Sequence, residues 1–314
     1  MGIYCVTGRD FFPGAVALLN SLRLLGHAEP FVVCDCGMEA RQRELLAPHA
    51  EIVPAPRGGP PSLLKFAAPL SRRAEVMILL DADVIVTRPL GELIESASSG
   101  SLVAFRNDRD RWFSEWGELL GLGEVPRGPY LTSSALFFGG SAGDRVMALA
   151  EERQLAIDAD ETWLGGGGEE RDPLYYLDQD VVNAVARARL RPDEVVAYPA
   201  RLAPIPPFGG LRLVDAGRLR CAYEDGTEPY LLHHASRKPW LVAMRSNVYS
   251  RLLTRLLLAD DVALRLPSAE LPVRLRTGAL AGAARVATDV GIGAPGYARR
   301  RLLPRRQRAW TDRR

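Results

Sequence analysis

The fold is decided by residues 78–84, which read Ile78-Leu79-Leu80-Asp81-Ala82-Asp83-Val84. The apolar run from Val76 to Leu80 is typical of a strand that is buried on both faces of a sheet. Two carboxylates follow this run directly, with one residue between them. Because ligands bind beyond the carboxyl ends of the strands in an open parallel sheet, we expect Asp81 and Asp83 to lie at a binding site.

A divalent cation is the first candidate ligand for this pair of carboxylates. Neighbouring carboxylates repel each other unless a cation joins them. Mg²⁺ and Mn²⁺ prefer oxygen ligands and often bridge protein carboxylates to the phosphates of a substrate. Asp81 and Asp83 are therefore candidate ligands of Mn²⁺ or Mg²⁺. The alternative is a strand-to-loop junction with two solvated acids, since an Asp-x-Asp pattern alone is common.

Strand and helix patterns alternate through the first 80 residues. Short apolar strands are predicted at residues 3–7, 31–35, 52–53 and 76–80, and helices at 13–25, 38–47 and part of 62–72. This alternation predicts an α/β fold with a mostly parallel central sheet and helices on both faces.

The rest of the chain is less regular. Strands are predicted at residues 102–105, 135–138 and 230–233, and helices at 178–189 and 248–258. We expect one α/β domain over residues 1–245 and a C-terminal helical extension with a basic tail over residues 246–314.

Composition sets the broad class of the protein. The chain has 314 residues, 47% of them hydrophobic, which is enough for one large α/β domain. It contains no run of 18 apolar residues, so we expect no membrane span. The N-terminus lacks the basic start, apolar stretch and cleavage site of a secretory signal, so we expect a cytoplasmic protein. The spacing of the four cysteines matches no metal or redox motif, which predicts free thiols at Cys5, Cys34, Cys36 and Cys221.

Positive charge is concentrated at the C-terminus. Residues 299–314 contain eight arginines and one aspartate, a net charge of +7, which leaves −5 on the remaining residues. A basic segment that also holds Leu302, Leu303 and Trp310 favours weak, salt-sensitive contact with an anionic membrane surface. The alternative is a solvated tail that aids solubility. We expect no nucleic-acid partner.

Lysine is almost absent from the sequence. Lys65 and Lys238 are the two lysines, and the other 38 of the 40 basic residues are arginines. An ammonium is a compact point charge, whereas a guanidinium is a planar fork, so some sites do not accept the exchange. Lys65 and Lys238 are therefore candidates for a specific task, although a coding bias toward arginine also explains the scarcity.

Three short segments around the two aspartates resemble the donor site of glycosyltransferase family 8. They are Ser62-Leu63-Leu64-Lys65-Phe66, residues 78–86 and Arg88-Pro89-Leu90. The family includes the glycogenins and bacterial lipooligosaccharide galactosyltransferases, and it has the GT-A fold, a nucleotide-binding α/β sheet. The resemblance implies that Lys65, sixteen residues before Asp81, contacts the donor near its diphosphate and sugar. It also places Ala82 among the nucleotide-binding residues.

Further along the chain, Asp178-Gln179-Asp180-Val181-Val182-Asn183 resembles the Asp-Gln-Asp-x-x-Asn motif of the same family. In the family, this motif places polar side chains beside the anomeric carbon and the acceptor. The resemblance implies that Asp178, Gln179 and Asp180 are the catalytic candidates. The alternative is an ordinary helix that Asp178 caps and that buries Val181, Val182 and Val185.

The segment from His233 to Trp240 resembles another motif of the family, His-x-x-Gly-x-x-Lys-Pro-Trp. There the histidine is a third metal ligand and the lysine binds the diphosphate, which implies a phosphate-binding role for Lys238. This sequence is one residue shorter between histidine and lysine, and it lacks the glycine. The metal ligand could therefore be His233 or His234. His233 is favoured because it follows directly after the strand pattern Tyr230-Leu231-Leu232.

A weaker match lies at the end of the first predicted strand. Thr7 and Phe11 resemble the nucleoside-binding loop of the family, where an aromatic ring can stack on a base. The alternative for Phe11 is a core side chain at the entrance of a helix.

The resemblance implies a retaining glycosyltransferase that depends on Mn²⁺ or Mg²⁺. Its expected donor is a nucleotide-diphosphate sugar, in particular a UDP-hexose, and its acceptor is an unidentified saccharide or small molecule. A sugar-phosphate nucleotidyltransferase and a catalytically inactive nucleotide-binding relative remain alternatives. A Rossmann dehydrogenase does not fit, because Thr7-Gly8-Arg9-Asp10 does not supply the Gly-x-Gly-x-x-Gly that follows the first strand of that fold.

Overall fold

The structure is a computed structural model that describes residues 1–235, 237–242, 244–271, 275, 283 and 287. The basic tail at residues 299–314, for which membrane contact is expected, lies outside the described residues. Among the described residues, no helix is both long and apolar enough to cross a bilayer.

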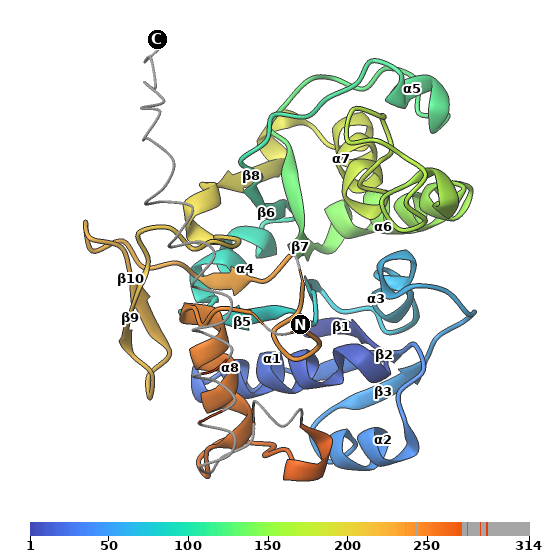
Figure 1. The fold of residues 1–314 in the computed structure, drawn as a ribbon. Coiled ribbons are helices and arrows are strands. Elements are labelled where there is room, and N and C mark those ends of the chain that lie inside the picture. The colour runs from blue at the N-terminus through green and yellow to red at the C-terminus, as the bar shows by residue number, and fades with distance from the viewer. Residues whose placement is uncertain (236, 243, 272–274, 276–282, 284–286, 288–314) are drawn as a thin grey trace.

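A seven-stranded sheet forms the centre of the molecule (Figure 1). Its strand order is β3-β2-β1-β4-β7-β6-β8. The strands are β1 Gly2–Thr7, β2 Phe31–Asp35, β3 Glu51–Pro54, β4 Val76–Leu80, β6 Leu102–Arg106, β7 Leu131–Gly139 and β8 Val195–Tyr198. Strand β7 runs antiparallel to both of its neighbours, and the other four neighbouring pairs are parallel. The mostly parallel α/β sheet expected from the sequence is confirmed.

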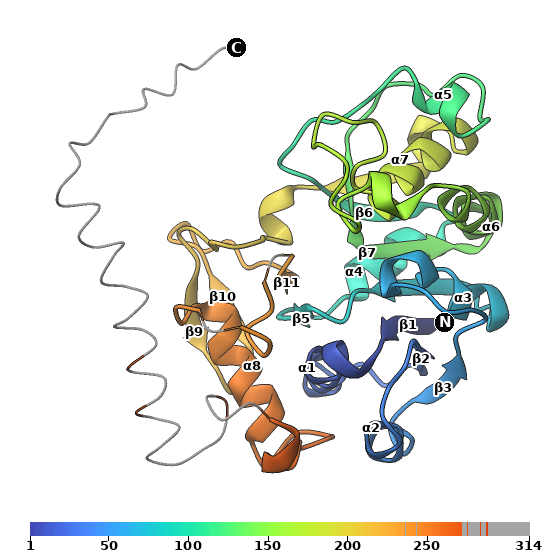
Figure 2. The same cartoon turned by 45° about the vertical axis from the view of Figure 1, so that its right-hand side comes forward.

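Helices cover both faces of this sheet (Figure 2). One face packs against α1 Phe12–Leu24, α2 Ala40–Leu46 and α4 Gly91–Ser98, and α8 Val248–Leu258 packs against α1 in the same core. The other packs against α3 Ala67–Ser71, α5 Trp116–Leu119, α6 Gly140–Leu155 and α7 Asp178–Arg189. Short 3₁₀ helices lie at Arg9–Phe11, Pro61–Leu64, Ala159–Glu161, Pro192–Glu194, Ala200–Leu202 and Ser268–Glu270.

Strand β4 is apolar throughout because both of its faces are covered. Val76, Ile78 and Leu80 belong to the core under α1, whereas Met77 and Leu79 belong to the core under α6 and α7. Complete burial of each such side chain contributes roughly 1.5–3 kcal/mol. These contacts fix the position of β4, so Asp81, the first residue beyond it, has a fixed position as well.

Strand β7 is longer than its apolar pattern predicts. The sequence predicts residues 135–138, but the strand begins at Leu131. Thr132, Ser133 and Ser134 are polar, and they are nevertheless buried, at 9%, 6% and 1% exposure. The strand pattern is hidden at this point because the hydroxyls are buried by hydrogen bonding: Thr132 bonds to Ser134, and Ser133 donates to Asp178.

Two small sheets complete the fold. Strand β5 (Val84–Val86) pairs antiparallel with β11 (Leu231–His233), and this register places His233 opposite Val84. Strands β9 (Arg212–Asp215) and β10 (Arg220–Ala222) form a hairpin at the side of the molecule (Figure 1). The pairing of β5 with β11 brings a late segment of the chain to the two aspartates.

Helix α8 is attached to α1 through a buried amide. The Asn20 side chain donates to the carbonyl oxygens of Leu256 and Leu264, at 2.7 and 2.8 Å, and accepts from the Leu264 amide at 2.9 Å. At its start, α8 is capped by Asn247, which accepts a hydrogen bond from the Ser250 amide. The leucines of α8 belong to the same core as α1. The proposed domain boundary near residue 245 stays a prediction.

Candidate functional site

The loop that carries the two aspartates is fixed by its backbone. The Asp81 amide donates to the Ser134 carbonyl at 2.9 Å, which extends the pairing of β4 with β7. The Val84 amide donates to the Asp81 carbonyl at 3.0 Å and closes a tight turn. The His234 amide donates to the Asp83 carbonyl, also at 3.0 Å. Both carboxylates therefore project from a rigid loop.

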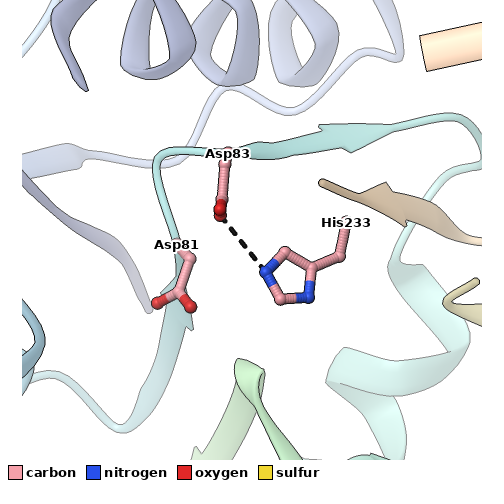
Figure 3. Close-up of side chains that lie close together, drawn as sticks. All are labelled: Asp81, Asp83 and His233. Carbon is pink, nitrogen blue, oxygen red and sulfur yellow. Dashed lines mark ion pairs between the residues drawn. The ribbon is translucent and has the colours of Figure 1, made fainter. Parts of the chain in front are cut away.

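Asp81, Asp83 and His233 form a group that could hold a metal ion. Each offers one ligand atom, and these atoms lie within 4.8 Å of one another. His233 Nε2 is 3.4 Å from an oxygen of Asp83, and Figure 3 shows the imidazole facing the Asp83 carboxylate with the Asp81 carboxylate alongside. The His233 Nδ1 atom is buried and has no hydrogen-bond partner among the described residues. Two carboxylates and one imidazole suit a cation such as Mn²⁺.

The neighbouring His234 lies elsewhere. Its side chain is 1% exposed and packs against the rings of Phe208 and Tyr249, with centroid separations of 5.9 and 5.0 Å. Burial, and then the charge of Lys238, lower the pKa of His234 to about 4, so the ring stays neutral at physiological pH. The geometry thus groups His233 with the two aspartates and gives the His234 ring a place in the core.

Lys65 links three parts of the site. Its ammonium contacts Asp81 Oδ1 at 2.9 Å, Asp178 Oδ2 at 2.7 Å and the Ser133 carbonyl at 2.8 Å. These three acceptors use all three donors of the ammonium. Burial alone would lower the pKa of Lys65, but the charges of Asp178 and Asp81 raise it above its ordinary value. Lys65 is therefore a permanent cation, although it is only 7% exposed.

Lys238 occupies a similar place beside the other aspartate. Its ammonium donates to the Asp83 carboxylate and, at 2.7 Å, to the His234 carbonyl. It also lies 5.8 Å from the centroid of the Phe11 ring. Burial works against the charged form of Asp83, yet His233 and Lys238 hold the pKa of this carboxyl below its ordinary value.

The charges of the site do not cancel. Asp81, Asp83 and Asp178 supply three carboxylates, whereas Lys65 and Lys238 supply two ammonium groups. One formal negative charge is left in a buried environment. In agreement, burial raises the pKa of Asp81, and the carboxylates of Asp83 and Asp178 add to that rise. Buried charges of this kind are stabilised by pairing or by a metal, so the donor set fits one more cation.

The start of α7 lies beside β7 at the same edge of the sheet. Asp178 accepts from the Ser133 hydroxyl at 2.8 Å as well as from Lys65. The Gln179 carbonyl oxygen Oε1 accepts from the Ser133 amide at 3.1 Å. Further along the helix, the Asn183 side chain donates to the Leu131 carbonyl and accepts from the Leu131 amide, both at 2.8 Å. These contacts bring Asp178 and Gln179 to Lys65 and the aspartates.

Asp180 points to a different environment. Its side chain is fully buried, and it accepts from Arg111 Nε and the Tyr130 hydroxyl at 2.7 Å each. It also accepts from the Tyr176 amide at 2.8 Å. Burial raises the pKa of Asp180, and Arg111 and Tyr130 oppose that rise. Of the three predicted catalytic residues, the structure brings Asp178 to Lys65, Gln179 to the Ser133 amide and Asp180 into a buried network.

The predicted nucleoside-binding residues differ in exposure and in their distance from Lys238. Phe11 is half-buried and packs edge-on against Trp240, with a centroid separation of 6.5 Å, next to Lys238. Thr7 has no exposed surface, and its hydroxyl donates to the Gly8 carbonyl at 3.4 Å. Contact of Thr7 with a nucleoside would require its neighbours to move. Ala82, at 5% exposure, turns its carbonyl toward Gly14 of α1.

Sequence reasoning missed Gly14 and Arg111. Gly14 follows Pro13 in a helical pattern, and a glycine inside such a pattern can indicate close packing. Arg111 gave no usable signal, because it is one of many arginines and its partner is 69 residues away.

The structure resembles solved glycosyltransferases. An active-site mutant of LgtC aligns with a TM-score of 0.55 at 14% sequence identity, over 86% of this chain and 98% of that one. The galactosyltransferase LgtC in complex with donor and acceptor sugar analogues aligns with a TM-score of 0.53 at 14% identity, over 83% and 98%. The bifunctional glycosyltransferase WbbM, in its apo form, aligns with a TM-score of 0.51 at 14% identity, over 84% of this chain and 50% of WbbM.

These similarities establish the fold. The chain has the GT-A fold, and the resemblance to glycosyltransferase family 8 is confirmed at the level of structure. The sequence itself matches no protein-family model and no curated protein.

Gly14 provides a test of how tightly the aspartate loop is held. A methyl group at Gly14 would lie 2.3 Å from the Ala82 carbonyl oxygen and 2.6 Å from the Trp240 ring. We expect Gly14→Ala to lower the free energy of unfolding by about 1–3 kcal/mol, because backbone and ring must both shift. Urea unfolding measures this change.

Gly91→Ala in α4 is the matched control. A methyl group at Gly91 would meet no atom within 4 Å. We expect this variant to be unchanged or more stable by up to about 1 kcal/mol, since alanine reduces the entropy of the unfolded chain. Equal stability of the Gly14→Ala variant and the unaltered protein would contradict the close approach of α1 to the aspartate loop.

Proposed function

We propose that this protein is a metal-dependent glycosyltransferase that uses a nucleotide-diphosphate sugar as donor. The observation that carries this proposal is the group of Asp81, Asp83 and His233, with Lys65 and Lys238 on either side, at the carboxyl end of β4. In open α/β sheets this edge is where ligands bind. The GT-A fold supports the same reading.

The chemistry of glycosyl transfer matches the charges at this edge. Cleavage of the bond between sugar and diphosphate builds negative charge on the leaving phosphate. Mn²⁺ or Mg²⁺ held by the two aspartates and His233 would neutralise part of that charge. Lys238, which pairs with Asp83 in the structure, would then be available to a phosphate oxygen. Lys65 would keep Asp81 and Asp178 in place and add a fixed positive charge nearby.

We infer that the donor is a UDP-hexose and that the acceptor carries a sugar hydroxyl. Support comes from LgtC, a galactosyltransferase that has been solved with donor and acceptor sugar analogues and that covers most of this chain. Phe11 presents a half-buried ring beside Lys238, where a base attached to the diphosphate could stack. Asp178 pairs with Lys65 and Gln179 bonds to the Ser133 amide, so both could contact the sugar that follows the diphosphate.

Metal-dependent nucleotide binding is the direct consequence. We expect UDP to bind at least about tenfold more tightly with Mn²⁺ than with a chelator, a difference of about 1.4 kcal/mol. The reason is the one uncompensated negative charge of Asp81, Asp83 and Asp178, which otherwise repels the diphosphate. Asp83→Asn should abolish the difference, and isothermal titration calorimetry measures all four affinities.

Asp193→Asn is the control for this experiment. Asp193 is 74% exposed and pairs with Arg191 at the surface. Its replacement should leave the effect of Mn²⁺ on UDP affinity unchanged. The metal-site proposal would be rejected by equal UDP affinity in Mn²⁺ and chelator, or by a normal Mn²⁺ effect in the Asp83→Asn variant.

The product should keep the anomeric configuration of the donor. Inversion generally needs a free carboxylate base near the acceptor hydroxyl. At this site Asp178 is paired with Lys65, and Asp180 is paired with Arg111 and Tyr130. The amide of Gln179 is too weak a base. The departing phosphate oxygen would therefore accept the proton on the same face of the sugar.

Proton NMR of the first-formed product tests this stereochemistry. An α-linked hexose from an α-configured UDP-hexose, with its small anomeric coupling, is the expected result. A β-linked first product would exclude same-face transfer and make Asp178 or Asp180 the candidate base.

A further inference from the structure

Arg111 joins three separate segments behind the start of α7. It belongs to the connection between β6 and β7, and its side chain is 7% exposed. Its Nε and Nη2 atoms donate to the two oxygens of Asp180, at 2.7 and 2.9 Å. Its Nη1 and Nη2 atoms also donate to the carbonyls of Glu170 and Asp172. One guanidinium thus holds the helix and the segment that leads into it.

The surroundings of Arg111 suit a guanidinium and no other cation. The Cζ atom of its guanidinium lies 4.6 Å from the ring centroid of Phe113 and 5.1 Å from that of Tyr176. A planar fork can stack on such rings while it binds a carboxylate through two parallel hydrogen bonds. Burial would lower the pKa of Arg111, but its hydrogen bond and charge interaction with Asp180 raise it. The guanidinium therefore stays charged.

The segment under this clamp contains an unusual backbone. Leu177, directly before Asp178, has φ of 42° and ψ of −102°, and its side chain is fully buried. Such a conformation costs a non-glycine residue about 1–3 kcal/mol and persists where its surroundings fix it. Before Leu177, Arg111 binds the carbonyls of Glu170 and Asp172. After Leu177, Asp180 binds Arg111 and also accepts a hydrogen bond from the Tyr176 amide. The clamp therefore acts on both sides of the strained residue.

The conformation of Leu177 determines where Asp178 points. With this backbone, Asp178 reaches Lys65 and the Ser133 hydroxyl, at 2.7 and 2.8 Å. Relaxation of Leu177 would rotate the first turn of α7 away from those partners. Arg111 contacts none of Asp81, Asp83 and His233, and the link from these residues to the first turn of α7 is Lys65, which binds both Asp81 and Asp178.

We propose that Arg111 is a positioning residue, which holds Leu177 in its strained conformation through Asp180 and so keeps Asp178 and Gln179 in place for the sugar. This inference rests on the proposed glycosyltransferase function. It assigns Asp180 to the clamp and separates the site into a metal and nucleotide part that Arg111 does not contact and a sugar part that Arg111 positions.

The separation predicts a split between binding and turnover. Arg111→Lys keeps the charge and loses the fork. It should leave the affinity for UDP in Mn²⁺ within about twofold and lower kcat for transfer of the hexose, to an acceptor or to water, by about 10- to 100-fold. In Arg111→Ala, ethylguanidinium added at millimolar concentration should restore part of kcat, whereas ethylammonium at the same concentration should not. Arg127→Lys, an exposed position in the same connection, should match the unaltered protein.

Hydrogen exchange provides a readout that does not depend on activity. Amides of residues 170–178 should exchange faster in Arg111→Lys, while those of β2 should not change. Tyr130→Phe removes one hydrogen-bond donor to Asp180 and replaces the Arg111 variants if these do not fold. It should raise the exchange rate and lower kcat in the same direction as Arg111→Lys, but by less. Unaltered exchange at residues 170–178, unaltered kcat, or equal rescue by both added cations would overturn the role of Arg111. Absence of UDP binding and turnover in the unaltered protein, with faster exchange in the variant, would instead refute the proposed function and leave the clamp intact.

Discussion

The Lys65 ammonium is the interaction on which the site depends. It binds Asp81 after β4, Ser133 of β7 and Asp178 of α7, and these three acceptors satisfy it completely. A buried cation is tolerated only with such full pairing. Strand β7 must run antiparallel for this arrangement, because Ala135 pairs with the last residue of β4 and residues 131–134 then continue past the end of that strand. A parallel strand would carry those residues away from the ligand edge.

The sequence predicted the parts of the fold and site that short segments determine. An apolar run followed by Asp81 and Asp83 gave β4 and its functional end, and the regular spacing of apolar residues gave α7 and α8 with the bounds the structure has. The scarcity of lysine indicated Lys65 and Lys238, and both contact the aspartates. Local patterns succeed here because each depends only on neighbours in the chain.

The remaining features depend on contacts between distant segments. The antiparallel direction of β7, the short strand β5, and the pairing of Arg111 with Asp180 leave no local signature. The choice between His233 and His234 likewise needed the register of β11 on β5, which turns one imidazole toward Asp83 and packs the other against Phe208 and Tyr249. The resemblance of the segment from Asp178 to Asn183 implied a catalytic role for Asp180, but that segment gives no sign of its partners Arg111 and Tyr130.

The central claim is that Asp81, Asp83 and His233 share one cation that meets the donor diphosphate. Diffraction from crystals grown with Mn²⁺ and UDP, with data collected at a wavelength where manganese scatters anomalously, tests it most directly. We expect one strong anomalous peak in contact with both carboxylates, a ring nitrogen of His233 and the diphosphate. An ordered UDP with no such peak, or with manganese bound away from these three side chains, would contradict it.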